Sequence, residues 1–458
     1  MAMTFFFNMH RIKNDHQMKL KIAIAGFFFL VSAASLFAQE DAILRNAKEI
    51  NSPQLDFSPV PFKNGILFTS SKSDRFLQCP PENAGDFTDI FFAPLLPDGS
   101  FGPKELLQGE LNGKYNDGVA AVLPGADKLI ITRNNTNGKN AADIIDLKLY
   151  ALEWTEGAWG NSVSLPFNSE DWSTAHPAMS QDGSLLVFSS NRPGSVNGSM
   201  DLWFSKNENG QWSEPINAGP GINTAGNELF PSLDELNNLY FSSNGHGGAG
   251  GLDLFAARRG DSAEWELVGN LGTPFSQAGD DVSFFPMESG TRGYYSGSRA
   301  DGTGLDDIYS WTYDPVKEVV VAVEDSLSGE RLPGARVDVS AIEFGSTLDK
   351  LFEVQFQNGQ LTLTADEKGE VTMKVRKGSS YEFVCSKEGY ISRTRREDDA
   401  GLIAEQPYVI KLPKATYYTD LTVMAIDADS KLFLPFSKIT LRNLSTGETT
   451  ELTADSLG

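Results

Sequence analysis

The amino-acid sequence predicts an all-β chain that begins with a ring of repeated four-stranded sheets, a β-propeller, and continues into β-sandwich modules. Two observations predict this fold class. A short apolar strand followed by a small polar loop recurs five times, and the chain carries 43 Gly and 22 Pro, as many short strands joined by tight turns require. The recurring strands read GILFTSSK, KLIITRNN, SLLVFSSNR, NLYFSSNG and RGYYSGSR.

The spacing of these strands predicts the size of the repeat. Their equivalent core residues are separated by 63, 57, 53 and 54 positions, and these residues are Phe68, Ile131, Phe188, Phe241 and Tyr295. A unit of about 50–55 residues matches one four-stranded blade. We therefore expect five blades within residues 41–315. The alternative is a six-bladed ring in which Ile43 to Ile50 belongs to an additional, degenerate blade.

The ring is expected to close through the start of the mature chain. Each of the first four units ends in an outer strand introduced by an aromatic residue, whereas the fifth lacks such a strand before the composition changes at Pro315. The segment AKEINSPQLDFSP resembles the blade junction PINAGPGINTAGNELFP. We infer that Ala47 to Ile50 supplies the outer strand of the fifth blade, which would leave no open sheet edge.

Residues 1–38 have the pattern of a signal peptide. A basic start at Met18 precedes an apolar run from Ile22 to Leu30, and small residues before Gln39 offer a cleavage site. A retained membrane anchor is the alternative. If residues 1–38 are cleaved off, we expect an exported protein with no membrane span. The formal net charge of −23 would repel nucleic acid, which we exclude as a partner.

Residue types that carry catalysis or bind zinc are sparse. Beyond residue 38 the only histidines are His176 and His246, and no Cys or His pair has the spacing of a zinc site. His246 lies near Ser242 and Asp253 in sequence, but no G-x-S-x-G motif exposes a serine nucleophile. We interpret His246 as a turn residue and expect no enzymatic activity.

An aspartate precedes the second aromatic strand in four of the five units, and the second unit has Lys148 there. These residues are Asp89, Asp201, Asp253 and Asp307. Some propeller glycosidases use carboxylates of this kind for catalysis. Because the residues follow the repeat, we favour a structural hydrogen bond at a turn or strand end.

The loop from Ala300 to Tyr309 is a weak calcium candidate. It contains Asp301, Asp306 and Asp307, and oxygen-rich loops can bind Ca²⁺. It lacks the D-x-D-x-D-G spacing and a following bidentate Glu. We expect no other cofactor.

Four loop positions are candidates for binding a ligand or a protein at one mouth of the propeller. They lie after the second strand of three units, and the competing interpretation is that they are solvated turns. These residues are Arg192, Asn244, His246 and Arg299.

The repeats resemble the PD40 group of WD40-like β-propellers, as found in TolB-type proteins. The resemblance extends from Ile43 to Tyr313, and its most specific part is SSNGHGGAGGLDLF, from Ser242 to Phe255. This stretch is similar to the blade signature of envelope proteins from Bacteroidetes-type bacteria. The second unit departs from the pattern at Lys148.

Residues 316–414 resemble a carboxypeptidase-regulatory-like domain, a small transthyretin-like β-sandwich. The resemblance rests on LPGA at 332–335, TAD at 364–366 and KEGY at 387–390. The same pattern restarts at 417–458, where Leu434-Pro435 matches Leu332-Pro333, although the first copy carries 13 additional residues around Phe344 to Gln357. The second copy reaches only the equivalent of Gly369, so we expect an incomplete sandwich and a longer protein.

The resemblance implies a place in the cell envelope. Propellers followed by regulatory-like domains occur in OmpA-family proteins, some of them in type IX secretion, where a C-terminal domain binds peptidoglycan. We therefore expect a non-catalytic scaffold, periplasmic and associated with the outer membrane, whose propeller binds an envelope protein. Peptidoglycan contact would require a domain outside this sequence. The alternative function is a propeller enzyme that hydrolyses glycans or peptides.

Overall fold

The structure is a computed structural model that describes residues 42–71, 87–135, 137–140, 143–260, 264–288, 290–314, 316–352, 360–404, 406–415, 422–442 and 449–457. The predicted signal peptide lies outside these ranges. The described residues are almost entirely β-strand and turn, which confirms the all-β prediction. Within them, no helix has the length and apolar character needed to cross a membrane.

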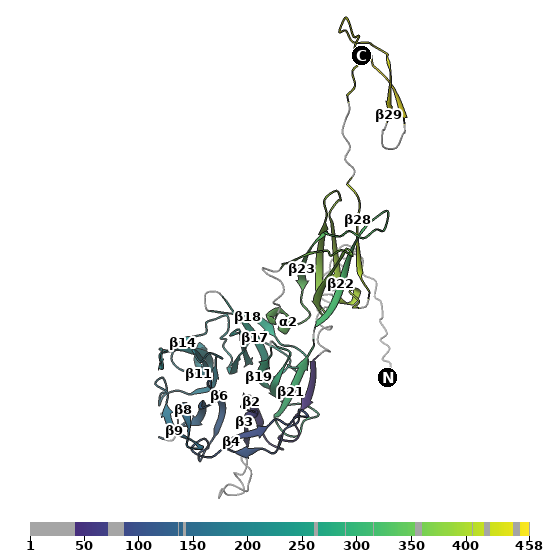
Figure 1. Ribbon diagram of the computed structural model, residues 1–458. Helices are drawn as coiled ribbons and strands as arrows, with labels where there is room; N and C mark the ends of the chain where they lie inside the picture. Colours follow the sequence, from purple (N-terminus) through teal and green to yellow (C-terminus); the bar gives the residue numbers. More distant parts are fainter. Residues whose placement is uncertain are drawn as a thin grey trace, which may run out of the picture.

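Five antiparallel sheets follow one another along the chain (Figure 1). The first contains β2 (Asp56–Phe62), β3 (Gly65–Ser71), β4 (Thr88–Pro94) and β5 (Glu105–Leu106). The second contains β6 (Asp117–Val122), β7 (Lys128–Asn134), β8 (Leu147–Thr155) and β9 (Ala158–Ser164). The third contains β10 (Thr174–Met179), β11 (Leu185–Ser190) and β12 (Asp201–Glu208), with the short strands β13 (Gln211–Trp212) and β14 (Ile216–Asn217) both paired to β12.

The last two sheets continue the same order. The fourth contains β15 (Glu228–Leu233), β16 (Leu239–Ser243), β17 (Asp253–Arg259) and β18 (Trp265–Asn270). The fifth contains β19 (Asp281–Met287), β20 (Arg292–Gly297), β21 (Asp307–Tyr313) and β1 (Ala42–Asn46). One short 3-10 helix, Val196–Gly198, lies in the loop before β12.

The first strands of the five sheets form a closed cycle. β2 contacts β6, β6 contacts β10, β10 contacts β15, β15 contacts β19, and β19 contacts β2 again. Apolar side chains fill the space between neighbouring sheets, as where Phe204 of the third sheet meets Trp265 of the fourth at a ring separation of 5.3 Å. This arrangement is consistent with the blades of a propeller around a central axis.

The ring closes through the N-terminal strand, but not through the residues that we expected. β1 pairs with β21 from Ala42 opposite Tyr313 to Asn46 opposite Tyr309. The predicted strand, Ala47 to Ile50, forms a turn in which the Ile50 amide donates to the Ala47 carbonyl at 3.0 Å. In β1, with the sequence AILRN, burial alternates from residue to residue and Leu44 faces the core, as in a strand. In the turn that follows, Ala47 and Ile50 are both buried. Residues 43–46 thus complete the fifth sheet instead of forming a sixth.

The first sandwich consists of two sheets with a shared core. One contains β22 (Val316–Asp325), β25 (Glu370–Arg376) and β28 (Tyr408–Leu412), and the other contains β23 (Arg336–Glu343), β24 (Gln360–Thr364), β26 (Ser380–Ser386) and β27 (Arg393–Asp398). A 3-10 helix, Asp399–Gly401, follows β27. Alternate residues of both sheets face inward, so Val321, Val337 and Phe383 are fully buried together.

The additional residues of the first sandwich join it to the ring. They include the short helix α2 (Thr347–Phe352), which lies beside β18 (Figure 1). Its Leu348, Leu351 and Phe352 side chains are buried with core residues of the fourth and fifth sheets. The Thr347 hydroxyl donates to the Asn270 carbonyl at 2.7 Å. In the second copy, which lacks this insertion, the described strands are β29 (Lys438–Arg442) and β30 (Thr449–Thr453), which form a hairpin.

Candidate functional site

Two of the predicted binding residues, Arg192 and Arg299, are buried in internal contacts. Arg192 donates to the Phe167 carbonyl at 2.7 Å, and its guanidinium lies 5.3 Å from the centre of the Phe188 ring. Arg299 forms an ion pair with Asp281 at 2.8 Å and donates to the Tyr295 hydroxyl at 3.0 Å. Both arginines therefore support their own sheets, the third and the fifth.

The other two predicted binding residues belong to the fourth sheet. The Asn244 side-chain oxygen accepts from the Asn227 amide at 2.8 Å. His246 contacts the Ile222 carbonyl through Nε2 at 2.7 Å, and its ring lies 5.1 Å from that of Phe255. The structure thus places the four candidates in loops of three different sheets, and each side chain contacts residues of its own or a neighbouring loop or strand.

Three of the four repeated aspartates, Asp201, Asp253 and Asp307, accept backbone hydrogen bonds from the loops before them, in line with the structural interpretation. Asp253 accepts from the amides of Ala249 and Gly250 at 3.2 and 3.1 Å, and Asp307 accepts from the Gly304 amide at 3.2 Å. Asp201 accepts from the Val196 amide at 3.0 Å. Each carboxylate holds the loop that precedes its strand.

The first strands of the five sheets surround the axis, and we call them the inner strands: β2, β6, β10, β15 and β19. A second set of buried acids begins four of these inner strands, and our sequence reasoning missed it. Each accepts the amide of the residue four positions earlier, at distances of 2.5 to 2.9 Å, and these acids are Asp56, Asp117, Glu228 and Asp281. The third sheet has Thr174 at this position. The signal was available in the sequence as an acid at the first position of four of the five inner strands.

The predicted calcium residues do not form a cation site. Among the residues that the structure describes, no group of three His, Cys, Asp or Glu side chains could hold a metal ion. The Asp307 carboxylate accepts a hydrogen bond from the Gly304 amide, and Asp301 is exposed. Burial and the nearby carboxylates of Asp280 and Asp307 raise the pKa of Asp306 to about 6.

The five inner strands share a bulge at the same position. The residue in the bulge has a positive φ between 35° and 58° in every sheet, and these residues are Ser58, Val119, His176, Phe230 and Ser283. Non-glycine residues rarely adopt this conformation, and a bulge redirects a side chain. All five residues line cavities at the centre of the ring.

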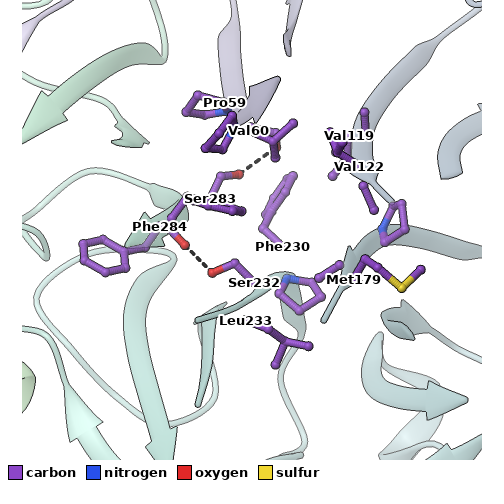
Figure 2. A pocket seen from close by; sticks show the side chains of 18 residues that line it. Pro59, Val60, Val119, Val122, Met179, Phe230, Ser232, Leu233, Ser283 and Phe284 are labelled. Atoms are coloured by element: carbon purple, nitrogen blue, oxygen red, sulfur yellow. Dashed lines mark hydrogen bonds between the residues drawn. The ribbon is translucent and has the colours of Figure 1, made fainter. Parts of the chain in front are cut away.

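Two cavities meet at Val119 and Phe230. The outer chamber, of about 250 Å³, is lined by Leu55, Phe57, Thr88, Asn116, Gly118, Val119, Thr132, Leu147, His176 and Phe230. The inner chamber, of about 70 Å³, has a largely apolar lining that includes Pro59, Pro61, Pro177 and Pro231. Figure 2 shows the Phe230 ring in the middle of the inner chamber, between Ser283 and Val119.

The polar groups of the inner chamber bond to one another. The hydroxyls of Ser58 and Ser283 lie 2.7 Å apart, and the Ser232 hydroxyl donates to the Phe284 carbonyl (Figure 2). These contacts join the fifth sheet to its two neighbours in the ring, the first and the fourth. The inner chamber is therefore an apolar space with satisfied hydroxyls.

The outer chamber contains an aromatic stack. The rings of His176 and Phe230 are 4.0 Å apart and inclined by 18°, and Phe57 meets Phe230 edge-on at 5.9 Å. The His176 backbone amide donates to the Thr132 hydroxyl at 2.9 Å. Burial lowers the pKa of His176 to about 3, so its ring is neutral at physiological pH. Our sequence reasoning counted His176 but gave it no role.

Comparisons with known proteins add fold likeness only. No family model matches the chain, and no curated protein matches it. Among solved structures, a Xanthomonas campestris gluconolactonase is 14% identical with a TM-score of 0.35, covering 62% of this chain and 93% of that chain. A thermostable family-43 glycoside hydrolase is 12% identical with a TM-score of 0.38, covering 56% and 88%. At this level of similarity neither supports an argument about function.

Proposed function

We propose that the chain is a non-catalytic binding protein of the bacterial envelope. A five-bladed β-propeller presents its loops to a protein partner, and transthyretin-like sandwiches connect it to the rest of an outer-membrane-associated, OmpA-family type of protein. The signal-peptide pattern and the resemblance of the repeats support the location. Participation in type IX secretion is part of the same proposal.

The observation that carries the proposal is how the acidic groups at the starts of the strands are used. A glycosidase needs two carboxylates that face its substrate, one of them available as an acid. Here Asp253 and Asp307 hold loop amides, while Asp56 and Asp281 hold the starts of inner strands and pair with Lys104 and Arg299. These groups support a rigid ring, which favours binding over hydrolysis.

The loops at one end of the ring supply a surface for a partner. Ile144 and Leu305, in the loops between the second and third strands of their sheets, are 54% and 63% exposed. These loops lie at the end of the ring where the inner strands begin, beside the outer chamber. Exposed apolar side chains on loop tips are typical of protein interfaces.

The test is capture of a partner from envelope extracts with the purified chain after chemical cross-linking. We expect Ile144→Ser and Leu305→Ser together to abolish capture. Leu236→Ser, in the turn at the opposite end of the ring, is the matched control because its side chain is 52% exposed. Hydrolysis of envelope glycans or peptides by the purified chain, with capture unaffected by the loop changes, would instead support the alternative enzyme.

A further inference from the structure

We propose that the outer chamber binds an uncharged aromatic ring that carries a hydrogen-bond acceptor, such as a phenol. The ring could be supplied by a tyrosine of the partner in the proposed function or by a free small molecule. The inference itself requires only the chamber and goes beyond the proposed function by naming what the centre of the ring recognises.

The shape and lining of the chamber select a flat apolar group. Phe57, His176 and Phe230 present aromatic surfaces, and Leu55 and Leu147 complete an apolar wall. No charged side chain belongs to the described lining. A charged ligand would therefore lose its hydration without gaining a partner, which is costly. Aromatic rings stack favourably on such surfaces.

His176 supplies the polar contact. Its Nδ1 is buried and has no hydrogen-bond partner among the described residues, so a proton there would be unsatisfied. The neutral ring then carries its hydrogen on Nε2, the nitrogen that is not among the buried, unpartnered atoms. An N–H donor on a residue that lines the chamber can pair with an acceptor on the ligand, and a phenol oxygen provides one.

The other polar groups of the chamber argue against a sugar. The Asn116 side-chain oxygen accepts from the Thr88 amide at 3.0 Å, and the Thr88 hydroxyl donates to the Asp117 carbonyl at 3.1 Å. The Thr132 hydroxyl accepts from the His176 amide. A sugar ring has several hydroxyls that need partners, and leaving them unpaired costs affinity. The oxygens of Asn116 and Thr132 already act as acceptors within the protein, and one acceptor on an aromatic ring matches the His176 donor.

The experiment compares 4-methylphenol with toluene by ligand-detected saturation-transfer NMR on the full chain. We expect 4-methylphenol to bind about fivefold more tightly, as one hydrogen bond allows. In His176→Phe, which keeps a ring for stacking, the two ligands should bind equally. In Phe230→Leu, both should weaken by about three- to tenfold. Leu236→Ser, at the far end of the ring, should change neither value.

The possible results separate the inference from the proposed function. Binding of methyl glucoside in preference to 4-methylphenol, an unchanged preference in His176→Phe, or absence of binding by both aromatic probes would overturn the inference. Displacement of 4-methylphenol by an acetyl-Gly-Tyr-Gly-amide peptide would support a protein side chain as the source. Binding of free 4-methylphenol without displacement by the peptide would support a small molecule. Either of these last two results supports binding of a phenol ring in the outer chamber. The capture experiment with envelope extracts tests the proposed function independently.

Discussion

The Asp349 carboxylate in the first sandwich accepts a hydrogen bond from the Tyr313 hydroxyl, at the end of the fifth sheet, at 2.9 Å. The same carboxylate pairs with Arg376 at 3.0 Å and is completely buried. Burial raises the pKa of Asp349, while Arg376 opposes the change. This contact ties the ring to the sandwich through the insertion that the second copy lacks.

We predict that Asp349→Ala destabilises the junction between ring and sandwich. The change removes the buried carboxylate from the Arg376 guanidinium and the Tyr313 hydroxyl, which still contact the Phe352 carbonyl and the Ser346 hydroxyl. Removing one member of a buried pair costs about 3–5 kcal/mol. Chemical unfolding of the full chain measures the loss. Glu367→Ala, at an exposed turn of the same sandwich, should change the free energy of unfolding by less than about 0.5 kcal/mol. Equal effects of the two changes would contradict the role of this contact.

Strand β1 should contribute to stability through its inward-facing side chain. Leu44 packs against the core of the fifth sheet, so Leu44→Ala should lower the free energy of unfolding by about 1–3 kcal/mol. Ile43, its neighbour in the same strand, is 69% exposed, and Ile43→Ala should have little effect. Thermal unfolding of the two variants tests whether β1 closes the ring. A larger loss from Ile43→Ala would mean that the strand is inverted.

The repeated aspartates should affect stability. Asp253 is buried and accepts two loop amides, so Asp253→Ala should cost about 1.5–3 kcal/mol, the range for hydrogen bonds to a charged group. Glu266→Ala, an exposed acid on β18, is the control. Denaturant titration measures both variants. A fully stable Asp253→Ala protein would argue that this carboxylate is kept for another purpose.

His176 should make stability depend on pH in a defined direction. Its pKa is about 3 in the folded chain and about 6.5 when unfolded, so between these values the unfolded chain binds the additional proton. The free energy of unfolding should therefore fall as the pH is lowered from 7 to 5. His176→Phe removes this contribution, so its stability should fall less over the same range. Parallel slopes in urea titrations at the two pH values would contradict a buried neutral imidazole.

The sequence predicted the positions of the five sheets correctly but not the strand that closes the ring. Spacing located all five sheets because Phe68, Ile131, Phe188, Phe241 and Tyr295 occupy equivalent core positions, and each is buried in the second strand of its sheet. The strand that closes the ring was predicted at Ala47 to Ile50, but the structure has it at Ala42–Asn46. Its pairing with β21 is a contact across more than 260 residues, which local resemblance between segments cannot register.

The candidate site was predicted less well. Arg192 and Arg299 were placed correctly on loops, but their side chains turn back into the sheets, and sequence does not show that orientation. His176 and Phe230 looked unremarkable because they lie 54 residues apart in different sheets. Only the bulged inner strands bring their rings to 4.0 Å.

The sequence by itself determined the all-β class, the period of the sheets and the second start of the sandwich pattern, because these depend on local alternation and turn chemistry that repeat along the chain. Tertiary structure decided which residues close the ring, which carboxylates accept hydrogen bonds from backbone amides, and which residues line the cavities at the centre of the ring. Those features depend on contacts between strands that are distant in sequence. The bulged residues His176 and Phe230 line one chamber because the inner strands that carry them lie around a common axis.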